Sequence, residues 1–349
     1  MENENQENRI EENQIEEQPE EEQAQEEVTY KEMSPMRLVA RRFFRSKLSI
    51  VGIVMIAFLF LFAFLGPVVY QAWGEESVDL SGKVLNLYAP YEDENGNIVT
   101  EFVTYESDIN SYAEPSATHL LGTDDNGMDV FTRLMYGGRI SLMIGFIVVI
   151  LETLIGIVIG GISGYFGGWV DNVIMRIVDI FNCIPTLPIL LLASAVIDSW
   201  QLPADQQIYF VMAMITLFSW SGTARLVRGQ ILSLREQEYM MAAEVMGLSA
   251  PRKIFKHLIP NVMPQLIVSM TLGLGSVILY ESTLSYLGLG VKAPKAAWGT
   301  MISLSNNPSI LGFHVNMWLP AGILIVIAVL GFNFIGDGLR DAMDPKARK

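Results

Sequence analysis

Six long apolar stretches, separated by polar segments, set the pattern of this chain of 349 residues. A helix needs about 20 apolar residues to cross the hydrocarbon core of a membrane, and each stretch approaches or exceeds that length. The pattern therefore predicts an all-α membrane protein with six transmembrane helices. The predicted spans are residues 48–70, 140–161, 173–197, 208–226, 266–286 and 317–335.

The polar segments between the spans alternate in charge. Six Lys and Arg residues lie between 31 and 47, before the first span, and three arginines lie in 225–235, after the fourth. Residues 72–118 instead carry ten Asp and Glu against a single Lys. Because basic segments stay on the cytoplasmic side of a membrane, both termini are predicted to be cytoplasmic and residues 72–118 external. Lys292 and Lys295 are the exceptions to this topology.

The charge pattern also divides the chain into segments. Runs of β-forming residues on either side of Glu94-Asn-Gly-Asn predict a hairpin within the external insert. The Glu-rich start lacks the apolar residues that folding needs, so it is expected to be disordered. The predicted segments are an acidic tail (1–30), a basic amphipathic segment with the first transmembrane helix (31–71), a small extracytoplasmic insert (72–135), a five-helix transmembrane core (136–340) and a cytoplasmic C-terminus (341–349).

Composition supports a membrane protein and excludes several other classes. Hydrophobic residues make up 51% of the chain and mean hydropathy is +0.34. The net charge of −15 argues against a nucleic-acid partner. No phosphate-binding loop or nucleophile motif is present, so we expect a protein that is not an enzyme and uses no cofactor. Cys183, alone in the sequence, is expected to serve packing.

A few residues within or beside the spans are candidates for function. Glu152 and Asp179 are ionisable at membrane depth, so they are expected to face the bundle interior or water and to belong to a transport pathway. For Asp179, pairing with Arg176 or a hydroxyl is an equal alternative. Glycines at every fourth position from 156 to 168 predict close helix packing. Trp298 is expected at the membrane interface.

The loop 236–260 between the fourth and fifth spans is the most distinctive polar segment. Residues 236–246 favour a helix, and Gly247 is the residue type most often found just past a helix end. Ser249 is placed to cap a second short helix, which Pro260 and Pro264 are expected to end. The loop is therefore predicted to be a helix, a sharp Gly turn and a second helix outside the bilayer.

This loop resembles the cytoplasmic coupling loop of ABC-importer permeases. That signature is Glu-Ala-Ala, three residues, Gly, nine residues and Ile-x-Leu-Pro. Ala242, Ala243, Gly247 and Pro260 match it, Ile259 replaces its Leu, Met241 stands where the family has Glu, and His257 where it often has Ile. By this resemblance, the residues expected to contact an ATPase subunit are Glu238, Ala242, Ala243, Glu244, Gly247, Ser249, Ile259 and Pro260.

A second run, residues 119–142, resembles the segment before the second helix of oligopeptide, dipeptide and nickel permeases. The typical pattern is His-x-Leu-Gly-Thr-Asp-x-x-Gly-Arg-Asp-Val, with Met128 here in place of the Arg. His119 and the nearby Asp124, Asp125 and Asp129 could suggest a metal site, but nothing in the sequence makes these ligands converge. The chain thus resembles the oligopeptide permease C type over roughly residues 35–345.

The resemblance implies a type I ABC importer permease fold in a bacterial inner membrane. It further implies a homologous second permease subunit, two cytoplasmic ATPase subunits that hydrolyse ATP, an extracytoplasmic substrate-binding protein and a peptide substrate. A proton-coupled secondary transporter that uses Glu152 and Asp179 is the alternative, although the two halves show no inverted repeat. Dependence of transport on ATP or on a proton gradient separates the two.

Overall fold

The computed structural model describes residues 35–86, 91–92, 97–99, 104–200 and 202–344. The predicted acidic tail and the basic end of the chain, residues 346–349, lie outside these residues. The chain divides into two units, Met1–Arg41 and Arg42–Lys349. In the first, the described residues are the opening turns of helix α2 (Pro35–Arg45). Everything below concerns the second unit.

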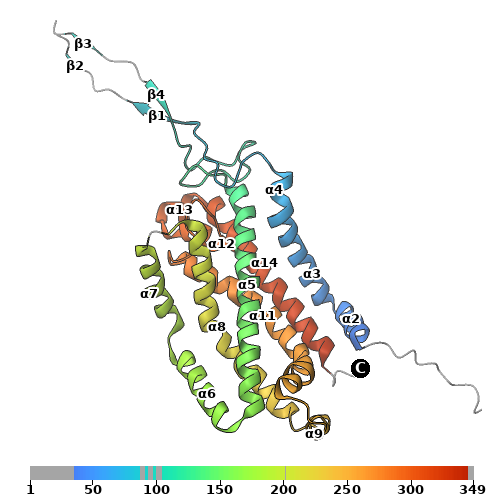
Figure 1. Ribbon diagram of the computed structural model, residues 1–349. Helices are drawn as coiled ribbons and strands as arrows, with labels where there is room; N and C mark the ends of the chain where they lie inside the picture. The colour runs from blue at the N-terminus through green and yellow to red at the C-terminus, as the bar shows by residue number, and fades with distance from the viewer. Residues whose placement is uncertain (1–34, 87–90, 93–96, 100–103, 201, 345–349) are drawn as a thin grey trace, which may run out of the picture. The chain divides into compact units, whose positions relative to one another are not determined.

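Long helices build the second unit, as predicted (Figure 1). Five of the described helical stretches are long and apolar enough to cross a membrane, and α6 with α7 adds a sixth if this bent pair counts as one span. The elements are α3 (Lys47–Phe60), a π-helical turn (Leu61–Leu65), α4 (Gly66–Val69), α5 (Val130–Phe166), α6 (Gly168–Cys183), α7 (Thr186–Ser199), α8 (Ala204–Leu234), α9 (Glu238–Val245), α10 (Ala250–Arg252), α11 (Ile259–Tyr286), α12 (Trp298–Ser303), α13 (Pro308–Phe313) and α14 (Val315–Met343).

The third predicted span is broken in the middle. Helices α6 and α7 meet at an angle of 78°. Ile184 leaves the helical region with φ −75° and ψ 123°, because the following Pro185 disfavours helical backbone at the residue before it. Cys183 ends α6 beside this break and is exposed, so the prediction that it packs inside the chain is wrong.

Helix α5 packs along α8 through the glycine row (Figure 1). A Cβ on Gly160 would stand 2.3 Å from the Ala224 carbonyl oxygen of α8, and one on Gly164 2.9 Å from the Arg228 carbonyl oxygen. Gly156 also faces α8, so the predicted close packing is confirmed for these three glycines. Gly168 differs, because a Cβ there would meet nothing within 4 Å. Helix α11 packs against both α5 and α14, and α14 packs against α3.

The segment between α11 and α14 is buried more deeply than expected. Trp298 has no exposed surface, and its indole N–H donates to the Leu134 carbonyl oxygen of α5 at 3.0 Å. The prediction of an interfacial Trp298 is therefore wrong: the ring fills the space above Gly138, where a Cβ would stand 2.8 Å from it. Ser141 joins the same contact by accepting from the Trp298 amide and donating to Glu281, which is fully buried.

The insert between α4 and α5 contains the predicted hairpin. Strand β1 (Gly82–Asn86) pairs antiparallel with β4 (Thr104–Asp108), and β2 (Tyr91–Glu92) pairs with β3 (Ile98–Val99). Residues 93–96 of the predicted turn lie outside the described residues.

The prediction that Pro260 ends the second loop helix is wrong. Residues 250–286 are helical throughout, with a π-helical turn at Lys253–Leu258. Pro260 follows this π-helical turn directly and Pro264 lies inside α11, so the helix continues through both prolines. The loop thus continues directly into a membrane-spanning helix.

Candidate functional site

Helix α9 is attached to the bundle by one of its faces. Met240 and Ala243 are buried, and Met240 packs in a cluster with Val227 and Ile231 of α8. Leu258, Val262 and Leu266, from the π-helical turn and α11, complete this cluster. The helix therefore contacts both elements that carry the chain into and out of the loop.

Gly247 closes α9 in the manner that the sequence predicts. Its φ is +71°, in the left-handed region that glycine adopts without strain. The amide of Gly247 donates to the Glu244 carbonyl at 2.9 Å and that of Leu248 to the Ala243 carbonyl at 3.1 Å, the two bonds of a Schellman cap. Ser249 occupies the N-cap position of α10, although its side chain makes no capping hydrogen bond.

The predicted contact residues of the loop divide into two groups. Glu238, Ala242, Glu244, Gly247, Ser249 and Pro260 are exposed. Ala243 and Ile259 are buried within the chain. These two therefore fix the loop to the bundle, and only the first group is available to another protein.

A cavity of about 520 Å³ lies where α9 meets the ends of α5 and α8. Arg235 donates to the Gly164 and Tyr165 carbonyl oxygens at the end of α5, at 3.2 and 3.3 Å. Lys253 is buried and its Nζ lies 5.4 Å from the centre of the Tyr165 ring. These two cations join the loop to the last turn of α5, a favourable place for positive charge.

Helix α6 is joined to α8 by two ion pairs. Asp171 accepts a bidentate pair from Arg228 and a further hydrogen bond from Ser163. Asp179 lies 2.7 Å from an Arg225 nitrogen and 3.9 Å from Arg176. The predicted Asp179–Arg176 pairing is present, but the shorter contact to Arg225 was not predicted, since 46 residues separate the two along the chain.

Glu152 is buried at the middle of α5. A Cβ on Gly273 of α11 would stand 3.6 Å from its Oε1, so the carboxyl group points toward α11. Among the described residues it makes no ion pair. Its role in a pathway stays a prediction, as does that of Asp179.

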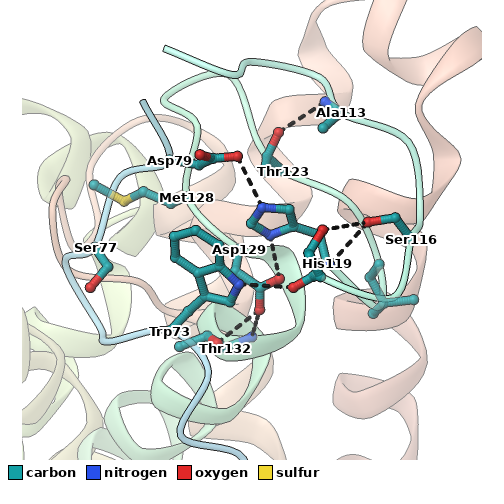
Figure 2. Close-up of polar contacts among 12 residues, drawn as sticks. Trp73, Ser77, Asp79, Ala113, Ser116, His119, Thr123, Met128, Asp129 and Thr132 are labelled. Carbon is teal, nitrogen blue, oxygen red and sulfur yellow. Dashed lines mark hydrogen bonds and ion pairs between the residues drawn. The ribbon is translucent and has the colours of Figure 1, made fainter. Parts of the chain in front are cut away.

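Near the start of α5, His119 is held between two aspartates (Figure 2). Its Nδ1 lies 3.0 Å from Asp129 and its Nε2 3.1 Å from Asp79, and its ring stacks on Trp73 at 4.4 Å. Asp129 also caps α5 by accepting from the Thr132 amide and hydroxyl at 2.8 Å. The motif that begins at His119 thus joins the insert to the start of α5.

Two of the three buried aspartates of this region, Asp79 and Asp124, have pKa values shifted in opposite directions. Burial alone would raise the pKa of Asp79, but hydrogen bonds from Asn110, Ser81 and His119 outweigh it and lower the pKa to about 2. Burial raises the pKa of Asp124 above its ordinary value, more than the neighbouring Arg133 lowers it. The pKa of each carboxyl group is therefore set by its own burial and local partners.

Arg133 occupies the neighbourhood of Met128, the residue that departs from the motif. Its guanidinium lies 2.7 Å from the Met128 sulfur and 3.0 Å from Asp124, and it donates to the Pro294 carbonyl oxygen at 3.2 Å. A guanidinium is thus present beside position 128 although the motif's own arginine is absent. Sequence reasoning missed this contact because Arg133 lies outside the motif.

Two known protein families match parts of this chain. Residues 156–349 match the family described as binding-protein-dependent transport system inner membrane component. Residues 34–82 match the N-terminal transmembrane domain of oligopeptide transport permease C. The chain is 37% identical to the oligopeptide transport system permease protein OppC of Bacillus subtilis, over 88% of each chain. It is 36% identical to the dipeptide transport system permease protein DppC of the same organism, over 88% of this chain and 85% of the relative.

Among solved structures, the inward-facing MetNI methionine ABC transporter is similar to this chain. The TM-score is 0.45 and the sequence identity 21%, over 61% of this chain and 97% of that one.

Proposed function

Because this chain belongs to the family of binding-protein-dependent transport system inner membrane components, it is a permease subunit of an ABC importer, and we propose that its cargo is peptides. It is a multi-pass membrane protein, and ATP is hydrolysed by separate subunits of such importers. The support for peptides is the likeness to the oligopeptide and dipeptide permeases over nearly the whole chain. The proton-coupled alternative finds no support in this family.

The complete importer would contain two permeases, two ATPase subunits and one substrate-binding protein. We propose that this chain pairs with a homologous permease to enclose the pathway, that two ATPase subunits bind on the cytoplasmic side, and that a substrate-binding protein delivers peptide from outside. The charge pattern supports a bacterial inner-membrane location with both termini in the cytoplasm.

The observation that carries the coupling role is the double attachment of α9. An ATPase that moves α9 would move Met240 and, through it, Val227 of α8 and Leu258 at the start of α11. Both helices then cross the membrane, and α5 follows α8 because their backbones touch at the glycine row. A push on the short cytoplasmic helix α9 would thus tilt the bundle between inward- and outward-facing states, since close-packed helices transmit strain.

Reconstitution tests this function. The chain is purified with its partner permease and ATPase subunits, and uptake of a labelled peptide into proteoliposomes is measured with and without ATP and binding protein. We expect uptake that requires both, and none with an ATPase subunit that cannot hydrolyse ATP. Uptake driven by a proton gradient without ATP, and lost in Glu152→Gln or Asp179→Asn, would contradict the proposal.

A further inference from the structure

We propose that Lys295 is a positioning residue of the transport cycle, which holds the start of α8 to the insert between α4 and α5 and resists opening at this end of the bundle. This inference rests on the proposed function and adds a residue that links ATP use to that opening. The ammonium group of Lys295 lies 3.1 Å from Glu75, 3.2 Å from Glu76 and 3.9 Å from Asp205. These four residues form an ion cluster in which three separate segments of the chain meet.

The ion cluster accounts for one exception in the charge pattern. Lys295 is a lysine in a segment that the pattern places outside the membrane, where basic residues are disfavoured. Burial would lower its pKa, but Glu75 and Glu76 outweigh this effect and raise the pKa above its ordinary value. The side chains of Lys295 and Glu75 are only 20% and 24% exposed. The ammonium group is therefore charged and is held by carboxylates more than by water.

The insert side of the ion cluster is firmly attached. The indole N–H of Trp73 donates to the Thr118 carbonyl oxygen at 2.8 Å, and the Trp73 ring stacks on His119. His119 in turn contacts Asp129, the N-cap residue of α5. Because Glu75 lies two residues from Trp73, the ion cluster joins the start of α8 to the start of α5.

The α8 side of the ion cluster is the part that can release. Asp205 makes the longest of the three contacts, and its side chain is 74% exposed. A cavity of about 380 Å³ lies beside this contact and is lined by both α5 and α8. Farther along, the same two helices touch through the glycine row. The start of α8 therefore has room to move relative to Lys295.

A tilt of α8 would break this contact. Under the proposed function, movement of α9 reaches Val227 of α8 through Met240. Because a packed helix moves as a stiff unit, the end of α8 that carries Asp205 moves as well. The ion cluster thus adds to the free energy that the ATPase subunits must supply before the bundle becomes outward-facing.

Loss of Lys295 would do more than remove an attraction. Its three carboxylate partners all lie within 4 Å of one nitrogen, so they would repel one another across less than about one Debye length. Arg139 also lines the cavity, but it donates to the Ala63 and Phe64 carbonyl oxygens at 2.8 and 3.0 Å and is held there. Asp205 would therefore be pushed away from the insert without any contribution from ATP.

ATP hydrolysis by the reconstituted importer tests the inference. The rate is measured without binding protein, and the number of peptides taken up per ATP is measured with it. Asp205→Asn should raise the rate without binding protein about two- to fivefold, as expected for loss of one exposed ion pair, and lower the peptides per ATP. Lys295→Met should raise that rate about tenfold, because repulsion adds to the lost attraction, whereas Lys295→Arg should keep the wild-type rate. The Asp205→Asn, Lys295→Met double variant should raise the rate by less than the product of the two single effects, since both changes break the same contact.

Glu114→Gln is the matched control, because it neutralises an exposed carboxylate of the same insert outside the ion cluster. It should leave the rate and the peptides per ATP unchanged. A general loss of stability would lower hydrolysis and uptake together, and Asp205→Asn alone decides the test if Lys295→Met does not assemble. Hydrolysis that is unchanged or lowered in Asp205→Asn, or raised equally in Glu114→Gln, would overturn the inference and leave the proposed function standing. Absence of ATP-dependent peptide uptake in the wild type would contradict the proposed function itself.

Discussion

Replacing Trp298 by Ala should strongly destabilise the packing of α12 against α5. The ring has no exposed surface and lies against Gly138, and its indole N–H donates a hydrogen bond to the Leu134 carbonyl oxygen. Truncation of a fully buried Trp costs about 3–5 kcal/mol through lost burial and the cavity that remains. Trp298→Phe keeps most of the ring and should cost about 1–2 kcal/mol, largely the indole hydrogen bond.

Heating of the detergent-purified subunit, followed by size-exclusion chromatography, measures the effect as a shift in the midpoint temperature. Trp169→Ala is the matched control, because that side chain is 77% exposed and its loss should change stability by less than about 0.5 kcal/mol. The midpoint temperature is expected to be highest for Trp169→Ala, lower for Trp298→Phe and lowest for Trp298→Ala. Equal midpoints for the two alanine variants would refute the packing described for α12.

Three further predictions concern other parts of the chain. The pKa of Asp79 is lowered to about 2, so its ionised form stabilises the fold by at most about 2 kcal/mol. This contribution is present above about pH 4 and is lost as the pH falls through about 2. In Asp79→Asn the thermal midpoint should therefore depend less on pH between these two values than in the wild type. Gly160→Val should separate α5 from α8 and lower the yield of folded subunit in size-exclusion chromatography, while Gly229→Ala, with nothing near its Cβ, should not. In a Cys183→Ala background, a cysteine at Asn306 should react with an impermeant thiol reagent in intact cells and one at Ser249 only after permeabilisation; the reverse would refute the topology.

The sequence predicted those features that depend on local pattern. Apolar length located the spans, because the membrane fixes how many residues a helix needs. Gly247 was predicted to form a sharp turn just past a helix end, and the structure has the φ of +71° that glycine adopts there at low cost. The glycine row likewise predicted close packing without identifying α8 as the partner.

Features that depend on tertiary contact were missed. Trp298 is typical of an interface by composition, but Gly138, 160 positions earlier, leaves room to bury it. Pro260 was expected to end a helix, yet the helix continues through it directly after a π-helical turn. Arg225 pairs with Asp179 and Arg133 with Asp124 through tertiary packing, which the spacing of residues within one motif does not indicate. Ala243 matches the signature of the coupling loop, although the structure uses it as an anchor.

The central claim, that movement enters this subunit through α9, is tested most directly at Gly247. A Cβ there would meet nothing within 4 Å, so Gly247→Val acts through its φ of +71° alone, at a cost of roughly 1–2 kcal/mol to the turn. Reconstituted importers carrying Gly247→Val or the control Gly229→Ala are compared for ATP-driven peptide uptake and for retention of the ATPase. We expect Gly247→Val to yield a stable subunit with poor ATPase retention and little uptake, and Gly229→Ala to match the wild type. Wild-type uptake in Gly247→Val would contradict the account.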